Sequence, residues 1–257
     1  CAILLEKPVS DSLDRLDVLQ KTAEISGSKI LVGFQFRYHP TLNKARELIQ
    51  SGVIGKILTV HAHWGEYLPN WHPWEDYRQS YAARAELGGG VIVTLTHPLD
   101  YLRFLLGDVE SLWSFNGHLS PLELNVEDAA EIGLKFSSGA VGGVHVNYFQ
   151  RPPVHRLEIV GTNGTLRWDN ADGVLHFFKM PAEFGTWDVN PPAAVEEQYP
   201  LTDRFERNQL FAAQMRHFVE TAHGESDPIC TLADGVNALR LALAAQESQR
   251  SGRVIQI

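Results

Sequence analysis

The sequence predicts an α/β (α+β) fold that begins with a parallel sheet and continues into an antiparallel one. Two strand–helix units in series occupy the first 54 residues, a pattern typical of a doubly wound parallel sheet. After Lys56 the apolar residues alternate with period two and short turns join the runs, as in an antiparallel meander. Two stretches with helix-capping residues near the C-terminus indicate helices that flank this sheet.

The first part reads as strand, helix, strand, helix. Apolar strands are expected over residues 2–5 and 29–35. Ser10 is expected to cap the first helix and Pro40 to open the second, with Gly27 and Gly52 as their ends. Because the chain lacks an initiator methionine and opens inside an apolar run, we expect a fragment, or the ordered remainder, of a longer protein.

The second part begins with a strand over residues 57–64, which places Trp64 on one face and His61 and His63 on the other. An aromatic segment from Tyr67 to Tyr81 has no clean period, so we expect a loop with short helical turns. Further strands are expected over residues 111–117, 130–136, 140–149, 155–161, 165–169 and 174–179.

The C-terminal part is expected to start with a surface loop over residues 181–198. Asp203 and Glu206 resemble a capping box, and Thr231 with Asp234 is expected to open the last helix, which ends near Gly252. Residues 254–257 are expected to form an edge strand. The buried stripe of the first of these two helices is expected to consist of Phe211, Met215, Phe218 and Ala222.

Residues 87–100, LGGGVIVTLTHPLD, combine flexible backbone with a lone histidine. Three glycines allow a backbone or a flat ligand to approach closely. The apolar residues after them are expected to be extended, with His97 where that segment turns into a helix over 98–106. The alternative is that the glycines only permit close packing and that His97 is only a cap.

Composition excludes several classes of function. A net charge of −9 argues against nucleic acid or an anionic membrane surface as a partner. No apolar run approaches the roughly 20 residues that a membrane helix needs, and two cysteines in a chain of this length fit a reducing, cytoplasmic compartment. No metal is expected, because no cysteine or carboxylate stands at a tight spacing to His61, His63 and His72.

Four groups of residues in this order carry a resemblance to a known family. They are Glu6-Lys7-Pro8, the run QFRYHP at 35–40, the GGG and HxxD pattern at 88–100, and ESQRSGRVIQI at the end. The set resembles the Gfo/Idh/MocA oxidoreductases, the group of glucose–fructose oxidoreductase and inositol dehydrogenase. The likeness covers nearly the whole chain, although a GxGxxG turn is absent.

The resemblance implies a domain division and an assembly. Residues 1–54 would be the C-terminal remnant of a Rossmann-type dinucleotide-binding domain. Residues 55–257 would form the substrate-binding and oligomerisation domain, a large open, mostly antiparallel sheet flanked by helices, with the last helix packing back on the Rossmann part. Since the open face needs a cover, a homo-oligomer through that face is expected. The remnant alone should bind a dinucleotide poorly.

The resemblance also implies a site. Lys7 and His97 would be catalytic, the former as acid/base and the latter as relay or substrate contact. NAD or NADP would be the cofactor, lined by Glu6, Lys7, Pro8 and Gln35. Arg37, Thr94 and His97 would contact the substrate. Independently of the resemblance, Trp74 and Tyr81 of the aromatic loop are candidates for a sugar ring, and Arg84 is a candidate for a charged substrate group. Many members carry an Asp where this chain has Thr94, whose hydroxyl can hydrogen-bond but cannot act as a carboxylate base.

The chemistry of hydride transfer supports this assignment. Several residues of the expected site also have an alternative, structural role. Hydride transfer from a carbinol needs a base for the hydroxyl proton and a cation for the developing alkoxide, which a desolvated lysine can supply. Alternatively, Lys7 forms only a surface ion pair. Asp100, in the first turn of a helix, is expected to be a cap or ion-pair partner. The aromatic loop could stack on a sugar ring, or its rings could only attach the loop to the sheet.

Two functions remain. The first is an NAD(P)-dependent oxidoreductase that transfers hydride to or from a hydroxyl carbon of a sugar, nucleotide sugar or cyclitol. The alternative is a non-catalytic binding or dimerisation domain of a protein of the same family.

Overall fold

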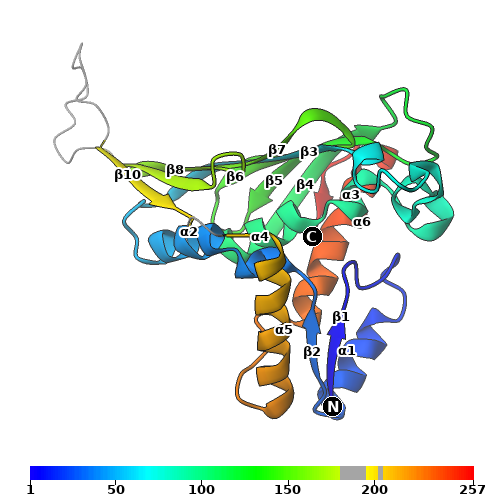
Figure 1. Cartoon of the computed structure of the whole chain (residues 1–257), viewed down its shortest axis with the longest axis horizontal. Helices are drawn as coiled ribbons and strands as arrows, with labels where there is room; N and C mark the ends of the chain where they lie inside the picture. The colour runs from blue at the N-terminus through cyan, green and yellow to red at the C-terminus, as the bar shows by residue number, and fades with distance from the viewer. Residues whose placement is uncertain (180–194, 202–204) are drawn as a thin grey trace.

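The computed structural model describes residues 1–179, 195–201 and 205–257. Within them the strands form a two-stranded sheet and a nine-stranded sheet in the order β10-β9-β8-β7-β3-β6-β5-β4-β11. Figure 1 shows the small sheet and its helices below the large sheet, whose upper face carries no helix. The predicted fold class is confirmed.

The small sheet pairs two parallel strands. β1 (Ala2–Leu5) and β2 (Lys29–Val32) align Ala2 with Lys29, and helix α1 (Leu16–Ile25) connects them. The expectation that Ser10 caps this helix was wrong. Its hydroxyl accepts a hydrogen bond from the Ser12 amide at 3.3 Å, which closes a turn, and the helix begins six residues later.

β2 is also shorter than predicted. The chain turns after Val32, and Gln35–Tyr38 form a 3-10 turn, η1, that leads into helix α2 (Pro40–Gln50). The amide of Gly33 donates to Leu5 O at 2.8 Å, so the strand ends where β1 ends. The last residues expected in the strand therefore leave the sheet at its carboxyl edge, where ligands bind in α/β proteins.

The large sheet contains every strand expected between residues 57 and 179. Its strands are antiparallel except for the pair β3–β6. Their bounds are β3 Ile57–Tyr67, β4 Val109–Gly117, β5 Ala129–Phe136, β6 Val141–Asn147, β7 Phe149–Gly161, β8 Gly164–Asp169, β9 Val174–Lys179, β10 Val195–Pro200 and β11 Ile255–Gln256. β11 pairs with β4 at one edge, as predicted.

The predicted surface loop over 181–198 was wrong at its end, because residues 195–198 belong to β10. Their backbone pairs with β9, for example Gln198 with His176, and so extends the sheet at an open edge. The remainder of that loop, and the Asp203 side of the expected capping box, lie outside the described residues.

One face of the large sheet is covered by helices. α2, α4 (His97–Leu106) and α6 (Leu232–Ser251) lie against it in Figure 1, and α6 also reaches β2. Thr231 and Asp234 form the predicted capping box of α6, and Gly252 ends it. The fully buried side chains at this interface include Leu42, Val60, Phe136, Ile159, Trp168 and Phe177.

Helix α5 (Asn208–His223) turns a different face inward than predicted. The expected stripe was wrong, since Phe211 is 42% and Met215 50% exposed, whereas Leu210 and Gln214 are buried. The ring of His217 fixes this rotation, because its Nε2 accepts from the Ile229 amide at 3.1 Å. A polar contact with the loop before α6 therefore overrides the apolar pattern.

A buried ion network joins the two sheets. The guanidinium of Arg37, in η1, donates to both carboxylate oxygens of Asp100 on α4, with Nε–Oδ2 at 3.0 Å and Nη2–Oδ1 at 2.7 Å. Its Nη1 donates to Ile229 O at 2.7 Å and to Asp234 on α6 at 3.2 Å. Arg103 donates to the other oxygen of Asp234 at 2.8 Å.

Arg37→Met is expected to lower the free energy of unfolding by about 3–5 kcal/mol, because the Asp100 carboxylate would stay buried without its partner. Urea denaturation followed by circular dichroism measures this. Arg250→Met, at the exposed end of α6, serves as the control and should keep its midpoint close to that of the parent. Equal midpoints for the two variants would contradict the structural role of Arg37.

Candidate active site

A cavity of ≈ 600 Å³ lies at the carboxyl end of β1, between the small sheet and the corner that joins α3 to α4. Its volume suits a small polar ligand such as a monosaccharide. Six of the residues expected in the site line it: Glu6, Lys7, Gln35, Tyr81, Thr94 and His97. The structure therefore brings together residues from four separate segments of the chain.

Lys7 lies two residues after the end of β1 and forms a hydrogen bond to the opposite wall of the cavity. Its Nζ donates to the backbone oxygen of Thr94 at 2.6 Å. Burial lowers the pKa of Lys7 to about 8, against the attraction of Glu6, and the charge of Arg207 lowers it further. A large fraction of this lysine is therefore neutral near pH 8.

His97 begins α4 and is buried. Desolvation holds its pKa well below 6.5, and the positive charge of Lys7 acts in the same direction. Its Nε2 lies 3.5 Å from Nε2 of Gln35, and its Nδ1 has no hydrogen-bond partner in the described part of the chain. The imidazole lines the cavity and is neutral at physiological pH.

The segment before His97 is helical, so the prediction of an extended run was wrong. Val91–Thr94 form one helical turn, α3. The backbone oxygen of Glu127 accepts from the Val91 amide at 3.0 Å, which replaces the strand pairing that the β-branched residues suggested. Gly90 has φ +116°, and a Cβ there would lie 2.5 Å from Glu127 Oε1. Glycine is thus required at position 90. The helical turn that follows it is fixed by Glu127 and ends at Thr94, whose backbone oxygen accepts from Lys7.

Three expected substrate contacts do not line the cavity. Arg37 is 3% exposed and has its donors committed to Asp100, Asp234 and Ile229. Trp74 is 77% exposed, and Arg84 pairs with Glu86 at the surface. Pro8 follows Lys7 across a cis peptide bond but is also absent from the lining. Asp100 is the ion-pair partner that its position in the helix suggested.

Trp71, one of the rings of the aromatic loop considered for stacking on a sugar, lines the cavity, whereas sequence reasoning missed other lining residues, among them Trp64, Gln150, Arg151 and Arg207. Trp64 had a usable signal, since it was placed on the buried face of its strand near the carboxyl end. The two arginines had none, because neither lies in a recognisable motif.

Behind His97 the core contains a column of histidine and tryptophan rings. Trp64 stacks on His97 with ring centroids 5.2 Å apart and on His155 at 4.0 Å. Trp168 contacts His155 at 4.6 Å and His39 at 5.0 Å. Burial lowers the pKa of His39 to about 4 and that of His155 well below 6.5. The column keeps three imidazoles neutral.

Acidification below pH 6.5 is expected to destabilise the fold. The unfolded chain protonates these histidines near pH 6.5 and the folded chain only at lower pH, so the free energy of unfolding falls by about 1.4 kcal/mol per pH unit for each of them. His155→Phe should reduce this slope, as measured by urea denaturation between pH 6.5 and 5. Phe136→Leu, in the core of the same sheet, should lower stability and keep the parent slope. An unchanged slope in His155→Phe would refute this account.

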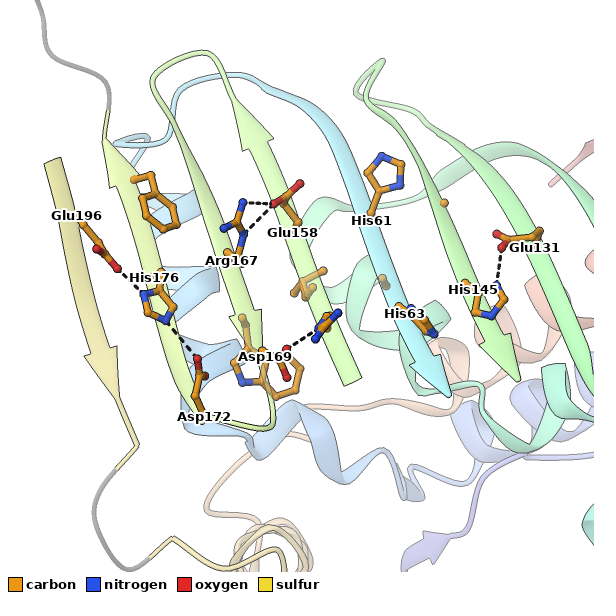
Figure 2. A pocket seen from close by; sticks show the side chains of 16 residues that line it. His61, His63, Glu131, His145, Glu158, Arg167, Asp169, Asp172, His176 and Glu196 are labelled. Atoms are coloured by element: carbon orange, nitrogen blue, oxygen red, sulfur yellow. Dashed lines mark hydrogen bonds and ion pairs between the residues drawn. The ribbon is translucent and has the colours of Figure 1, made fainter. Parts of the chain in front are cut away.

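A larger hollow of ≈ 750 Å³ lies over the uncovered face of the large sheet. Figure 2 shows its ion pairs: His145 with Glu131, His176 with Glu196, and Arg167 with Glu158. These groups bind one another on an open surface, and the lysine of lowered pKa lies elsewhere. We therefore place acid–base chemistry in the smaller cavity.

Two further features were sought in the described ranges. No group of three His, Cys, Asp or Glu side chains there is arranged to hold a metal ion. None of the helices in those ranges combines the length and apolar character that crossing a membrane requires.

A cavity with a partly neutral lysine and a neutral histidine, beside the carboxyl edge of a parallel sheet, is typical of an α/β enzyme. Residues 46–257 match the model of the Gfo/Idh/MocA oxidoreductase family, C-terminal alpha/beta domain, and the chain belongs to this family. The resemblance stated from the sequence is confirmed.

Named relatives support the same family. The chain is 27% identical over 270 residues to scyllo-inositol 2-dehydrogenase (NAD(+)) of Bacillus subtilis, covering 99% of this chain and 70% of the relative. It is 26% identical over 260 residues to D-apiose dehydrogenase of Rhizobium rhizogenes, covering 99% and 72%. The structure of a levoglucosan dehydrogenase complex with NADH and levoglucosan superposes with a TM-score of 0.85 at 18% identity, covering 100% and 74%, which shows the shared fold.

Proposed function

We propose that this protein transfers hydride between NAD or NADP and a hydroxyl-bearing carbon of a sugar, nucleotide sugar or cyclitol. The observation that carries the proposal is the pair Lys7 and His97 on one cavity, the first with its pKa lowered to about 8 and the second neutral. The names of the relatives, an inositol and an apiose dehydrogenase, agree with a polyhydroxylated substrate.

The residues present fit a nicotinamide beside the cavity. Glu6, Lys7 and Gln35 stand at the carboxyl edge of β1 and β2, and a Cβ at residue 33 would lie 3.0 Å from the Glu6 carboxylate. Since these three side chains line the cavity, they would lie beside the ring of the nicotinamide. In this proposal residues 1–54 belong to the nucleotide-binding domain and residues 55–257 to the substrate domain. When bound, the nicotinamide ring accepts or supplies the hydride.

Side chains of the protein then accept and return the proton of the substrate hydroxyl. Neutral Lys7 accepts the proton of the substrate hydroxyl, and the bond from Nζ to Thr94 O holds the amine in place. The ammonium that results stabilises the alkoxide in the reverse direction. His97 stays neutral and can hydrogen-bond the same hydroxyl or its neighbour, while burial raises the pKa of Tyr81 so that its hydroxyl remains a donor.

Lys7→Met is expected to lower kcat/KM for alcohol oxidation by about 10²–10⁴-fold, the usual contribution of a general base. In the parent, kcat/KM should rise with pH through about 8 and then level off, since Lys7 must lose its proton to act. Steady-state assays of nicotinamide reduction with a polyol panel measure both. Lys21→Met, on the exposed side of α1, is the control with parent activity. If Lys7→Met turns over substrate as fast as the parent, the assignment is wrong.

We also propose, as the second function, assembly through the uncovered face of the large sheet. The face exposes aromatic side chains, with Phe115 70% and Trp113 43% exposed, next to the histidine and carboxylate pairs of Figure 2. Apolar rings within a polar, self-complementary surface suit a second copy of the same sheet.

Phe115→Arg is expected to convert a dimer at micromolar concentration into a monomer, because it places a charge in the apolar part of the interface. Sedimentation velocity measures this. Ile25→Arg, at the exposed end of α1, should leave the dimer intact. A parent protein that sediments as a monomer would overturn the proposed interface. A dimer that turns over no polyol would favour the non-catalytic alternative.

A further inference from the structure

We infer that the substrate carries an anionic substituent, a carboxylate or a phosphate, which Arg151 and Arg207 bind. This inference rests on the proposed function and adds the charge of the substrate to it. Both arginines line the cavity that contains Lys7 and His97. They come from different elements, since Arg151 lies near the start of β7 and Arg207 directly precedes α5.

Neither arginine has a carboxylate partner among the described residues, in contrast to Arg84, Arg103 and Arg156, which pair with Glu86, Asp108 and Asp169. The guanidinium of Arg151 lies over the ring of Tyr67, 4.2 Å from its centroid. Stacking occupies the face of a guanidinium and leaves its N–H donors, which point outward in its plane, available to a ligand.

The charge of Arg207 reaches the catalytic pair. It lowers the pKa of Lys7 and also that of His97, so its charge is felt across the cavity. Because Lys7 and the two arginines line one cavity, a single substrate molecule can place its hydroxyl at Lys7 and its anionic group at the guanidiniums.

The carboxylates of the lining do not neutralise these arginines. Glu66 accepts a hydrogen bond from Trp64 Nε1 at 2.8 Å, and Glu6 packs against Gly33 and acts on Lys7. With Lys7 neutral, the lining has two arginines and two carboxylates, and neither carboxylate forms an ion pair with an arginine in the described part of the chain. Guanidiniums without a carboxylate partner favour an anion at this position.

The test compares a hexose, the corresponding hexuronate and the hexose 6-phosphate in steady-state assays of the full-length protein with NAD or NADP. The kcat/KM for one of the two anions should exceed that for the neutral hexose at least about tenfold, as expected for charge-assisted hydrogen bonds. Which anion is preferred distinguishes carboxylate from phosphate. Arg151→Gln and Arg207→Gln should each lower that kcat/KM about 10- to 100-fold, a loss at least about tenfold larger than the loss that either causes for the hexose.

Arg216→Gln, exposed on α5, is the matched control and should behave as the parent. Equal kcat/KM for all three sugars, or a raised KM for the dinucleotide in the arginine variants, would overturn the inference.

A binding measurement separates this inference from the proposed function. Quenching of tryptophan fluorescence by the same sugars reports on Trp64 and Trp71 in the lining. Saturable binding of an anionic sugar that both arginine variants lose, without any turnover, would refute the proposed function and support the inference. Turnover of neutral sugars, with no binding of the anions, would refute the inference alone.

Discussion

The ion network of Arg37 is the constraint on which the arrangement of the site depends. It connects η1, α4 and α6, three elements that are far apart in the sequence. Gln35 lies at the start of η1 and His97 at the start of α4, so the bidentate bond to Asp100 determines how these two residues face each other. A buried ion pair is costly to desolvate and adds little net stability. Its value here is orientation, because a guanidinium fork bonds a carboxylate in few geometries.

Much of the architecture could be predicted from local patterns, because strands and helices bury their apolar residues with different periods. The errors occurred where a distant partner outweighed the local pattern. Glu127 makes residues 91–94 helical, and His217 rotates α5 away from its apolar stripe. The grouping of Lys7 with His97 came from a family resemblance, since no spacing reveals it. Arg37 was expected to contact the substrate because of its position in the family pattern, and its partners Asp100 and Asp234, 63 and 197 residues away, could not be foreseen from the local sequence.

Burial shifts the pKa of both residues of the proposed acid–base pair. Removing water from Lys7 lowers its pKa into a useful range, and removing water from His97 keeps the imidazole uncharged. The same desolvation extends through Trp64 to His155, so the packing that tunes the site also makes the core sensitive to acid. In this fold, the desolvation that favours the proposed proton transfer therefore also lowers the stability of the protein at low pH.

The position of β3 in the large sheet has a consequence for how the chain folds. Val60 pairs with Gly142 on one side and Ile159 on the other, although both follow it by more than eighty residues. The central strand is thus synthesised early, whereas the two strands that pair with it are synthesised late. Pairings of such long range are associated with slow folding and exposed strand edges. During synthesis on the ribosome, β3 would wait with both edges unpaired until β6 and β7 emerge, and this interval is when a chaperone would matter most.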